Sequence, residues 1–134
     1  MAHLELVSLI VPDYDRAIAF FVGVLGFTLV EDAPATSSRD GRAKRWVVVR
    51  PPGAATGLLL ARADHPAEER AIGAQAAGRV GFFLRVDDFD AALARLRAAG
   101  AVVHGAPRDE PYGRVVVFED VCGNRWDLLG PRPA

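Results

Sequence analysis

The first sixty residues carry two kinds of hydrophobic pattern. Residues 4–11 are mostly apolar and include valine and isoleucine, which predicts a strand. Asp13 follows as a candidate N-cap, and apolar side chains at spacings of three and four predict a helix to about Leu25, ended by Gly26. Polar composition marks a loop at 32–43. Further strands are expected at 27–31, 45–50 and 57–62.

The same pattern returns 75 positions later. Residues 84–94 (LRVDDFDAALA) match residues 9–19 (LIVPDYDRAIA) at six of eleven positions, and Asp88 takes the place of Asp13. A strand at 80–86 and a helix at 89–99, ended by Gly100, are therefore expected. The remaining strands are predicted at 101–104, 114–119 and 125–129.

The duplication predicts an α+β fold of two tandem βαβββ units forming a cupped, eight-stranded mixed sheet. We expect one domain over 1–134, with a first unit at about 4–62 and a second at about 79–130. Residues 63–78 contain two glycines and no strand pattern, which predicts a linker with about one helical turn.

Composition limits the function classes. The chain is 51% hydrophobic and 25% charged with a net charge of −1, which is typical of a globular protein and gives no basic surface for nucleic acid or anionic membranes. Without an export signal or a long apolar segment, a cytoplasmic location is expected. The lone Cys122 excludes an intrachain disulfide and is interpreted as structural.

Three segments together resemble one known superfamily. Residues 11–15 (VPDYD) open the first helix, 25–27 (LGF) close it, and 118–128 (FEDVCGNRWDL) end the second unit. With the duplication, they resemble the vicinal oxygen chelate superfamily, which contains glyoxalase I, extradiol dioxygenases, fosfomycin-resistance transferases and bleomycin-resistance binding proteins. The resemblance spans about residues 4–130 and implies the fold, which hosts both metalloenzymes and metal-free binders.

The resemblance also implies where metal ligands would stand. The opening-strand positions fall on Leu6 and Gly81, and the closing-strand positions on Leu58 or Leu59 and on Asp127. One carboxylate cannot hold a catalytic divalent ion, so we expect no metal, no cofactor and no catalytic residue of the usual kind.

A relocated metal site is the alternative, and the three histidines are its candidates. They show no ligand spacing on one element, and surface or strand-end roles are favoured. They are His3, His65 and His104.

Strand alternation predicts which side chains line the concave side of the sheet. Arg85 and Asp127 are its ionisable pair; they either form a salt bridge with each other or bind a ligand. Trp126 and Leu128 are expected beneath the helix instead. The candidate lining residues are Ser8, Ile10, Phe83, Arg85, Arg125 and Asp127.

Two further aromatic residues are candidate ligand contacts. Trp46 begins a strand, where its indole either stacks on a ligand or packs in the core. Tyr112 lies in a loop between Pro111 and Gly113, where its hydroxyl, together with Glu110, could reach a polar group of a substrate.

A metal-free protein that binds a small organic molecule is the favoured function. The alternative is a glyoxalase-like lyase or an extradiol-dioxygenase-like oxidoreductase with an unconventional metal site; a structural or protein-interaction role is the third hypothesis. Whether the protein is an enzyme stays open at this point. Open sheet edges favour a homodimer.

Overall fold

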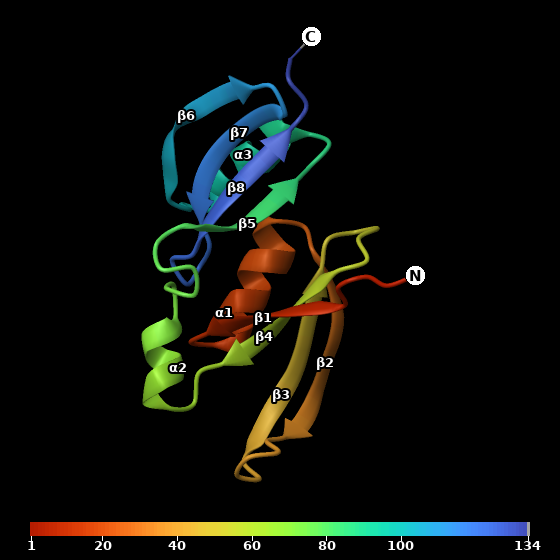
Figure 1. Ribbon diagram of the computed structural model, residues 1–134, viewed down its shortest axis with the longest axis vertical. Helices are drawn as coiled ribbons and strands as arrows, with labels where there is room; N and C mark the ends of the chain where they lie inside the picture. Colours follow the sequence, from red (N-terminus) through yellow and green to blue (C-terminus); the bar gives the residue numbers. More distant parts are fainter. Residues whose placement is uncertain (134) are drawn as a thin grey trace. The chain divides into compact units, whose positions relative to one another are not determined.

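The computed structural model describes residues 1–133 and divides the chain into two compact units, Met1–Arg70 and the segment from Ala71 onward. The order βαβββ occurs once in each unit (Figure 1), which confirms the predicted α+β class and its two repeats. The eight strands form two four-stranded sheets.

In the first unit, the strands are arranged in the order β1-β4-β3-β2, with β1 and β4 parallel and the other pairs antiparallel. The helix α1 continues directly into a π-helical segment, η1. The elements are β1 (Leu6–Val11), α1 (Tyr14–Ile18), η1 (Ala19–Val24), β2 (Thr28–Thr36), β3 (Ala43–Arg50), β4 (Gly57–Arg62) and α2 (Pro66–Ala71).

The second unit repeats this topology with the order β5-β8-β7-β6, in which β5 and β8 are the parallel pair. Its helix is a regular ten-residue α-helix. The elements are β5 (Val80–Arg85), α3 (Phe89–Ala98), β6 (Val103–Glu110), β7 (Gly113–Glu119) and β8 (Arg125–Gly130).

Matching caps fix both helices. The Arg16 backbone N–H donates to Asp13 Oδ1 at 3.0 Å, and this hydrogen bond holds the pKa of Asp13 below its ordinary value. The Ala91 N–H donates to Asp88 Oδ1 at 3.1 Å. Gly26 and Gly100 follow the helices with φ of 76° and 73°, in the left-handed region that glycine adopts without strain.

One loop prediction and one strand prediction are corrected by the edge strands. The stretch 32–43 is not all loop, because β2 continues to Thr36 and pairs there with Ala43. An edge strand exposed on both faces tolerates polar residues, and Arg45 joins Asp32 across the strands at 2.7 Å. The strand expected at 101–104 begins at Val103 and runs to Glu110; its pairing is irregular between His104 and Arg108, which accommodates Pro107 at an edge.

Each sheet has one face against its helix and one turned away from it, which we call the open face. Leu9, Leu60 and Val47 pack on the helix side of the first unit with no more than 1% exposure. Phe118 and Leu128 do so in the second. Among residues 1–133, no helix is long and apolar enough to cross a membrane.

Candidate ligand-binding faces

Strand register places the predicted acid and aromatic residues of the second unit on one face. Phe83 pairs with Asp127, and Arg85 pairs with Leu129, so these side chains share the open face. Arg125 lies two residues before Asp127 on β8 and has the same orientation. Trp126 points to the helix side, where its ring stacks on Phe82 at 4.5 Å, as the alternation predicts.

Asp127 is the most unusual polar residue on this face. It is only 8% exposed, and its Oδ1 is buried without a hydrogen-bond partner among residues 1–133. Burial raises the pKa of Asp127, and the nearby Arg108 cation opposes that rise only in part. Beside it on β5, the ring of Phe83 is 65% exposed. An acceptor without a partner therefore lies next to an uncovered apolar surface.

Arg85 does not neutralise this carboxylate. Its guanidinium donates to the carbonyl oxygen of Tyr112 at 3.2 Å, and within residues 1–133 no ion pair joins Arg85 to Asp127. The salt-bridge interpretation is therefore not supported by the structure. Arg85 is exposed and has a charge that no carboxylate compensates in the described chain.

The structure brings Tyr112 near Arg85 through its backbone. Tyr112 lies in the tight turn between β6 and β7, where Glu110 pairs with Gly113, and its side chain is 54% exposed. Glu110 accepts a hydrogen bond from Arg108 Nε at 3.0 Å, which raises the pKa of Arg108. The Tyr112 ring is thus accessible, whereas the carboxylate of Glu110 is already paired.

The open face of the first unit has different chemistry at the same positions. Ser8 pairs with Leu59, and Ile10 pairs with Ala61. Trp46 shares this face, because it is two residues from Val48, which pairs with Leu59. Trp46 is half-buried, and this exposure is compatible with both roles considered for it, core packing and ligand contact.

The strand register shows which residues occupy the metal-ligand positions implied by the superfamily. Leu59, and not Leu58, is the counterpart of Asp127, because Leu59 pairs with Ser8 as Asp127 pairs with Phe83. Leu6 and Leu59 offer no ligand atom. A Cβ added at Gly81 would lie 3.1 Å from the Cβ of Ala76, so that position has no room for a histidine without a shift. These residues do not fit the metal of the superfamily.

The three histidines each lie beside a carboxylate. His3 Nε2 is 3.5 Å from Glu5, and His104 Nε2 is 2.6 Å from Glu119. His65 belongs to a group with Asp64 and Glu68, whose ligand atoms lie within 4.8 Å of one another.

This group of one imidazole and two carboxylates is a candidate metal site. The sequence analysis missed it because His65 was considered without the two acids. However, Arg39 donates to Glu68 at 3.0 Å and lies 3.0 Å from His65 Nε2. A guanidinium already supplies the positive charge that the acids attract.

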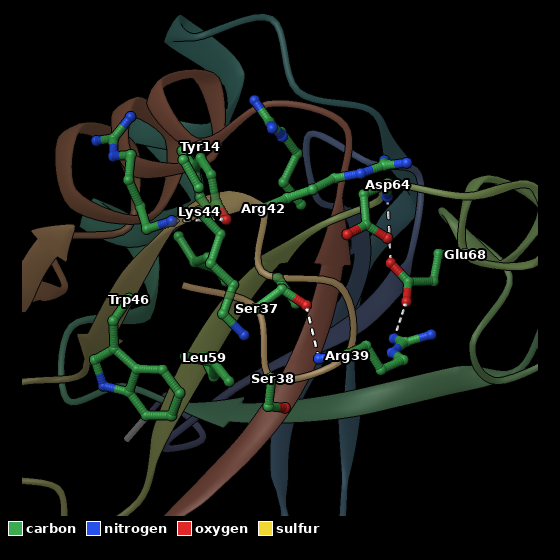
Figure 2. Close-up of a pocket in the computed structure, with 15 residues that line it drawn as sticks. Tyr14, Ser37, Ser38, Arg39, Arg42, Lys44, Trp46, Leu59, Asp64 and Glu68 are labelled. Carbon is green, nitrogen blue, oxygen red and sulfur yellow. Dashed lines mark hydrogen bonds and ion pairs between the residues drawn. The ribbon is translucent and has the colours of Figure 1, made fainter. Parts of the chain in front are cut away.

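A cavity of about 250 Å³ opens in the first unit beneath the loop that joins β2 to β3 (Figure 2). Trp46 lines it, but most of its other residues were not singled out from the sequence. The run 39–45 (RDGRAKR) contained a signal, since four of its seven residues are cationic. The missed polar lining residues include the phenol and the cations Tyr14, Arg39, Arg42, Lys44, Arg45 and Arg62.

A duplicated βαβββ chain with an open face on each sheet defines the class of protein. The chain belongs to the Glyoxalase/Bleomycin resistance protein/Dioxygenase superfamily, whose family model matches residues 1–128. The resemblance noted in the sequence is thereby confirmed.

Similar proteins agree with this assignment. An uncharacterized protein of Shewanella frigidimarina (strain NCIMB 400) is 48% identical over 124 residues, which is 92% of this chain and 89% of the relative. TnmS3, described as an antibiotic binding protein from Streptomyces sp. CB03234, is 36% identical with a TM-score of 0.74, covering 98% of this chain and 97% of its own. A glyoxalase/bleomycin resistance protein from the same Streptomyces strain is 35% identical with a TM-score of 0.71, covering 95% and 99%.

Proposed function

We propose that this protein binds a small organic molecule on the open faces of its sheets, without a metal ion, and that Asp127 is the principal polar anchor. The observation that carries the proposal is the buried Asp127 Oδ1 without a partner beside the exposed ring of Phe83. Buried polar atoms are seldom left unpaired, because the lost hydration costs about 1–3 kcal/mol. A ligand with an O–H or N–H donor would supply the missing hydrogen bond.

The neighbouring residues extend the proposed contact. Phe83 offers an apolar surface for the body of the ligand, and the uncompensated guanidinium of Arg85 suits a carbonyl or anionic group. Tyr112 and Arg125 complete the proposed set in the second unit. Ser8, Ile10 and Trp46 are the proposed contacts on the open face of the first. The description of TnmS3 as an antibiotic binding protein supports a binding role.

A metalloenzyme is the second candidate, a lyase or an oxidoreductase with a metal at an unconventional place. The group Asp64, His65 and Glu68 is the observation that favours it. Arg39 opposes it by occupying the same carboxylate and imidazole. Metal analysis of the purified protein separates the two candidates, because the binding protein needs no stoichiometric metal.

The binding proposal predicts a specific loss on mutation. A thermal-shift screen of small aromatic alcohols, amides and carboxylates identifies a ligand, and calorimetric titration measures its affinity. Asp127→Leu introduces the side chain that Leu59 has at the equivalent position of the first unit. It should weaken binding about tenfold or more, since a hydrogen bond to a charged group contributes roughly 1.5–3 kcal/mol. Arg85→Leu should weaken binding of anionic or carbonyl-bearing hits.

Arg97→Leu, which removes an exposed charge from α3, is the matched control and should leave the affinity unchanged. EDTA should have no effect; loss of binding on chelation would instead support the metalloenzyme. The double variant Arg85→Leu with Asp127→Leu should show additive stability changes, whereas strong coupling would restore the salt-bridge interpretation.

We also propose a cytoplasmic homodimer. The strands β1 and β2 in one sheet, and β5 and β6 in the other, have one unpaired edge each, and exposed Val7 and Phe83 lie on two of them. Open edges with apolar side chains favour association with a second chain. Light scattering should give about twice the chain mass of 14.4 kDa. A single species at the mass of one chain would contradict this prediction.

A further inference from the structure

We propose that the cavity of the first unit is a separate binding site for a small organic anion with a flat apolar body, such as an aromatic carboxylate. The cavity lies wholly within that unit, beneath the loop 37–42 and over β3 and β4 (Figure 2). The cavity does not include the Asp127 site, which belongs to the other unit, but it shares Trp46 with the contacts proposed above for the first unit.

The loop that covers the cavity is held in place by its own hydrogen bonds. Ser37 N–H donates to the Arg42 carbonyl at 2.8 Å, and Gly41 N–H donates to the Ser37 carbonyl at 2.9 Å. Arg42 N–H donates to Asp40 Oδ1 at 3.0 Å, which lowers the pKa of Asp40. Gly41 has a φ of 72°, which other residues adopt only with strain. The wall is therefore preorganised.

A second set of bonds ties this loop to α2. Arg39 donates to Glu68 Oε2 at 3.0 Å, and Glu68 Oε1 accepts from the Asp64 N–H at 3.2 Å. Figure 2 shows these residues at one rim of the cavity. Glu68 is thus occupied by donors of the protein itself, which leaves its carboxylate little capacity to bind a cationic ligand.

The floor of the cavity supplies apolar and aromatic surface. Trp46, Leu59 and Ala61 reach it from the open face of β3 and β4. Tyr14 reaches it from α1; its ring is 6% exposed and is fixed because the Arg45 N–H donates to its hydroxyl oxygen at 3.2 Å. A flat ring of a ligand can pack on Trp46. At about 250 Å³, the cavity is slightly smaller than the roughly 300 Å³ lower limit of drug-sized pockets, which favours one fused ring system.

The charge balance selects an anion. Five cationic side chains line the cavity, against the carboxylates of Asp64 and Glu68. Three of the cations have carboxylate partners: Arg39 with Glu68, Arg42 with Asp40, and Arg45 with Asp32 and Asp15.

Two cations remain uncompensated. Lys44 has no ion pair or side-chain hydrogen bond within the described chain, and the described contact of Arg62 is with the Tyr14 ring, 5.5 Å from its centroid. These two charges, beside an indole, are the recognition elements for an aromatic carboxylate.

Two probes of the same shape test the inference. Titration of the full-length protein with 2-naphthoate should give saturable binding and a change in tryptophan fluorescence. The neutral 2-naphthamide should bind at least about tenfold more weakly, because it lacks the charge that Lys44 and Arg62 recognise. Added salt should weaken naphthoate binding. Equal affinities for the two probes, or no saturable binding of naphthoate, would overturn the proposal.

Variants locate the site. Lys44→Met removes an exposed charge without a partner, so the fold should be unaffected, as a thermal denaturation curve can verify. Naphthoate affinity should fall severalfold in Lys44→Met and in Arg62→Met, but remain unchanged in Arg97→Met, the control on α3.

Arg85→Leu distinguishes this cavity from the proposed contacts of the second unit, to which Arg85 belongs. If Arg85→Leu abolishes binding while Lys44→Met does not, the anion binds in the second unit, and the inference is wrong while the proposed function survives.

Discussion

The open faces of the two units differ at positions that the register makes equivalent. Ser8 beside Leu59 in the first unit corresponds to Phe83 beside Asp127 in the second. The first pair places the apolar residue on the inner strand and a small polar residue at the edge, and the second pair reverses this order. Strand order and helix caps are the same in both units, so the duplicated backbone is retained while the open faces diverge in chemistry.

The helix sides differ as well. In the first unit, Leu58 pairs with Val7 and Val49. The equivalent positions of the second unit are Trp126 with Phe82 and Phe118, whose rings lie 4.5 and 5.8 Å from the indole. The second unit thus has an aromatic stack where the first has aliphatic side chains.

A buried carboxylate anchors this stack. Asp120, 6% exposed, accepts from the Trp126 indole N–H at 2.9 Å and from the backbone N–H groups of Cys122 and Asn124 at 2.9 and 3.0 Å. The charge is therefore satisfied by donors, in contrast to Asp127 seven residues later. Cys122 takes part through its backbone N–H.

The largest predicted effect comes from making the second unit resemble the first at this stack. Trp126→Leu removes a side chain that is 3% exposed and leaves Asp120 Oδ2 without its indole donor. We expect a loss of about 3 kcal/mol or more in the free energy of unfolding, measured by urea denaturation. Trp46→Leu is the control, because its half-buried indole should cost less than half as much. Equal losses would mean that the stack does not distinguish the units.

Asp127 gives a smaller effect with a defined pH dependence. Its pKa is raised in the folded state because burial disfavours the charged carboxylate. The stabilisation that Asp127 contributes is therefore fully present at pH values below its unfolded-state pKa, and it is lost as the pH rises through its folded-state pKa.

Asp127→Asn does not titrate, so its stability relative to the wild type should rise as the pH increases from below the ordinary carboxyl pKa of 3.8 through the raised folded-state pKa of Asp127. Urea denaturation at each pH measures the difference. A difference that does not change with pH would show that Asp127 is hydrated or paired in solution.

The helix sides of both units could be predicted from sequence, and the binding surfaces only in part. The repeat of residues 9–19 at 84–94 and the alternation along β8 placed Asp127, Phe83 and Trp126 on their correct faces, because side-chain direction has a strict period of two in a strand. The partner of Arg85 could not be predicted, since its hydrogen bond to the Tyr112 carbonyl depends on the path of a turn 27 residues away.

The cavity of the first unit was missed for a related reason. Two of its cations, Arg39 and Arg42, lie in a stretch interpreted as a loop, and the end of β2 at Thr36 fixes where that loop begins. Polar residues in an edge strand resemble loop composition, so local sequence does not distinguish them. The group of Asp64, His65 and Glu68 became visible only when α2 placed Glu68 beside His65.

The smallest predicted effect concerns the contact between the loop 37–42 and α2. The stability that this contact provides depends on pH with the opposite sign to that provided by Asp127. Burial alone would raise the pKa of Glu68, but hydrogen bonds from Arg39 and from the Asp64 N–H outweigh it and hold the pKa below the ordinary 4.5. A depressed folded-state pKa gives stability that is present above pH 4.5 and is lost as the pH falls through the folded-state pKa of Glu68.

Glu68→Gln should therefore lower the free energy of unfolding near neutral pH. The loss should be only about 0.5 kcal/mol, because Arg39 is exposed and its charge is screened by solvent. The difference should shrink in high salt and vanish in acid, as urea denaturation can measure. Glu69→Gln, on the same helix, is the control and should have no such dependence. If Glu68→Gln instead destabilises the protein by as much as Trp126→Leu, the exposed ion pairs of the first unit matter as much as the buried network of the second, and the contrast drawn between the units fails.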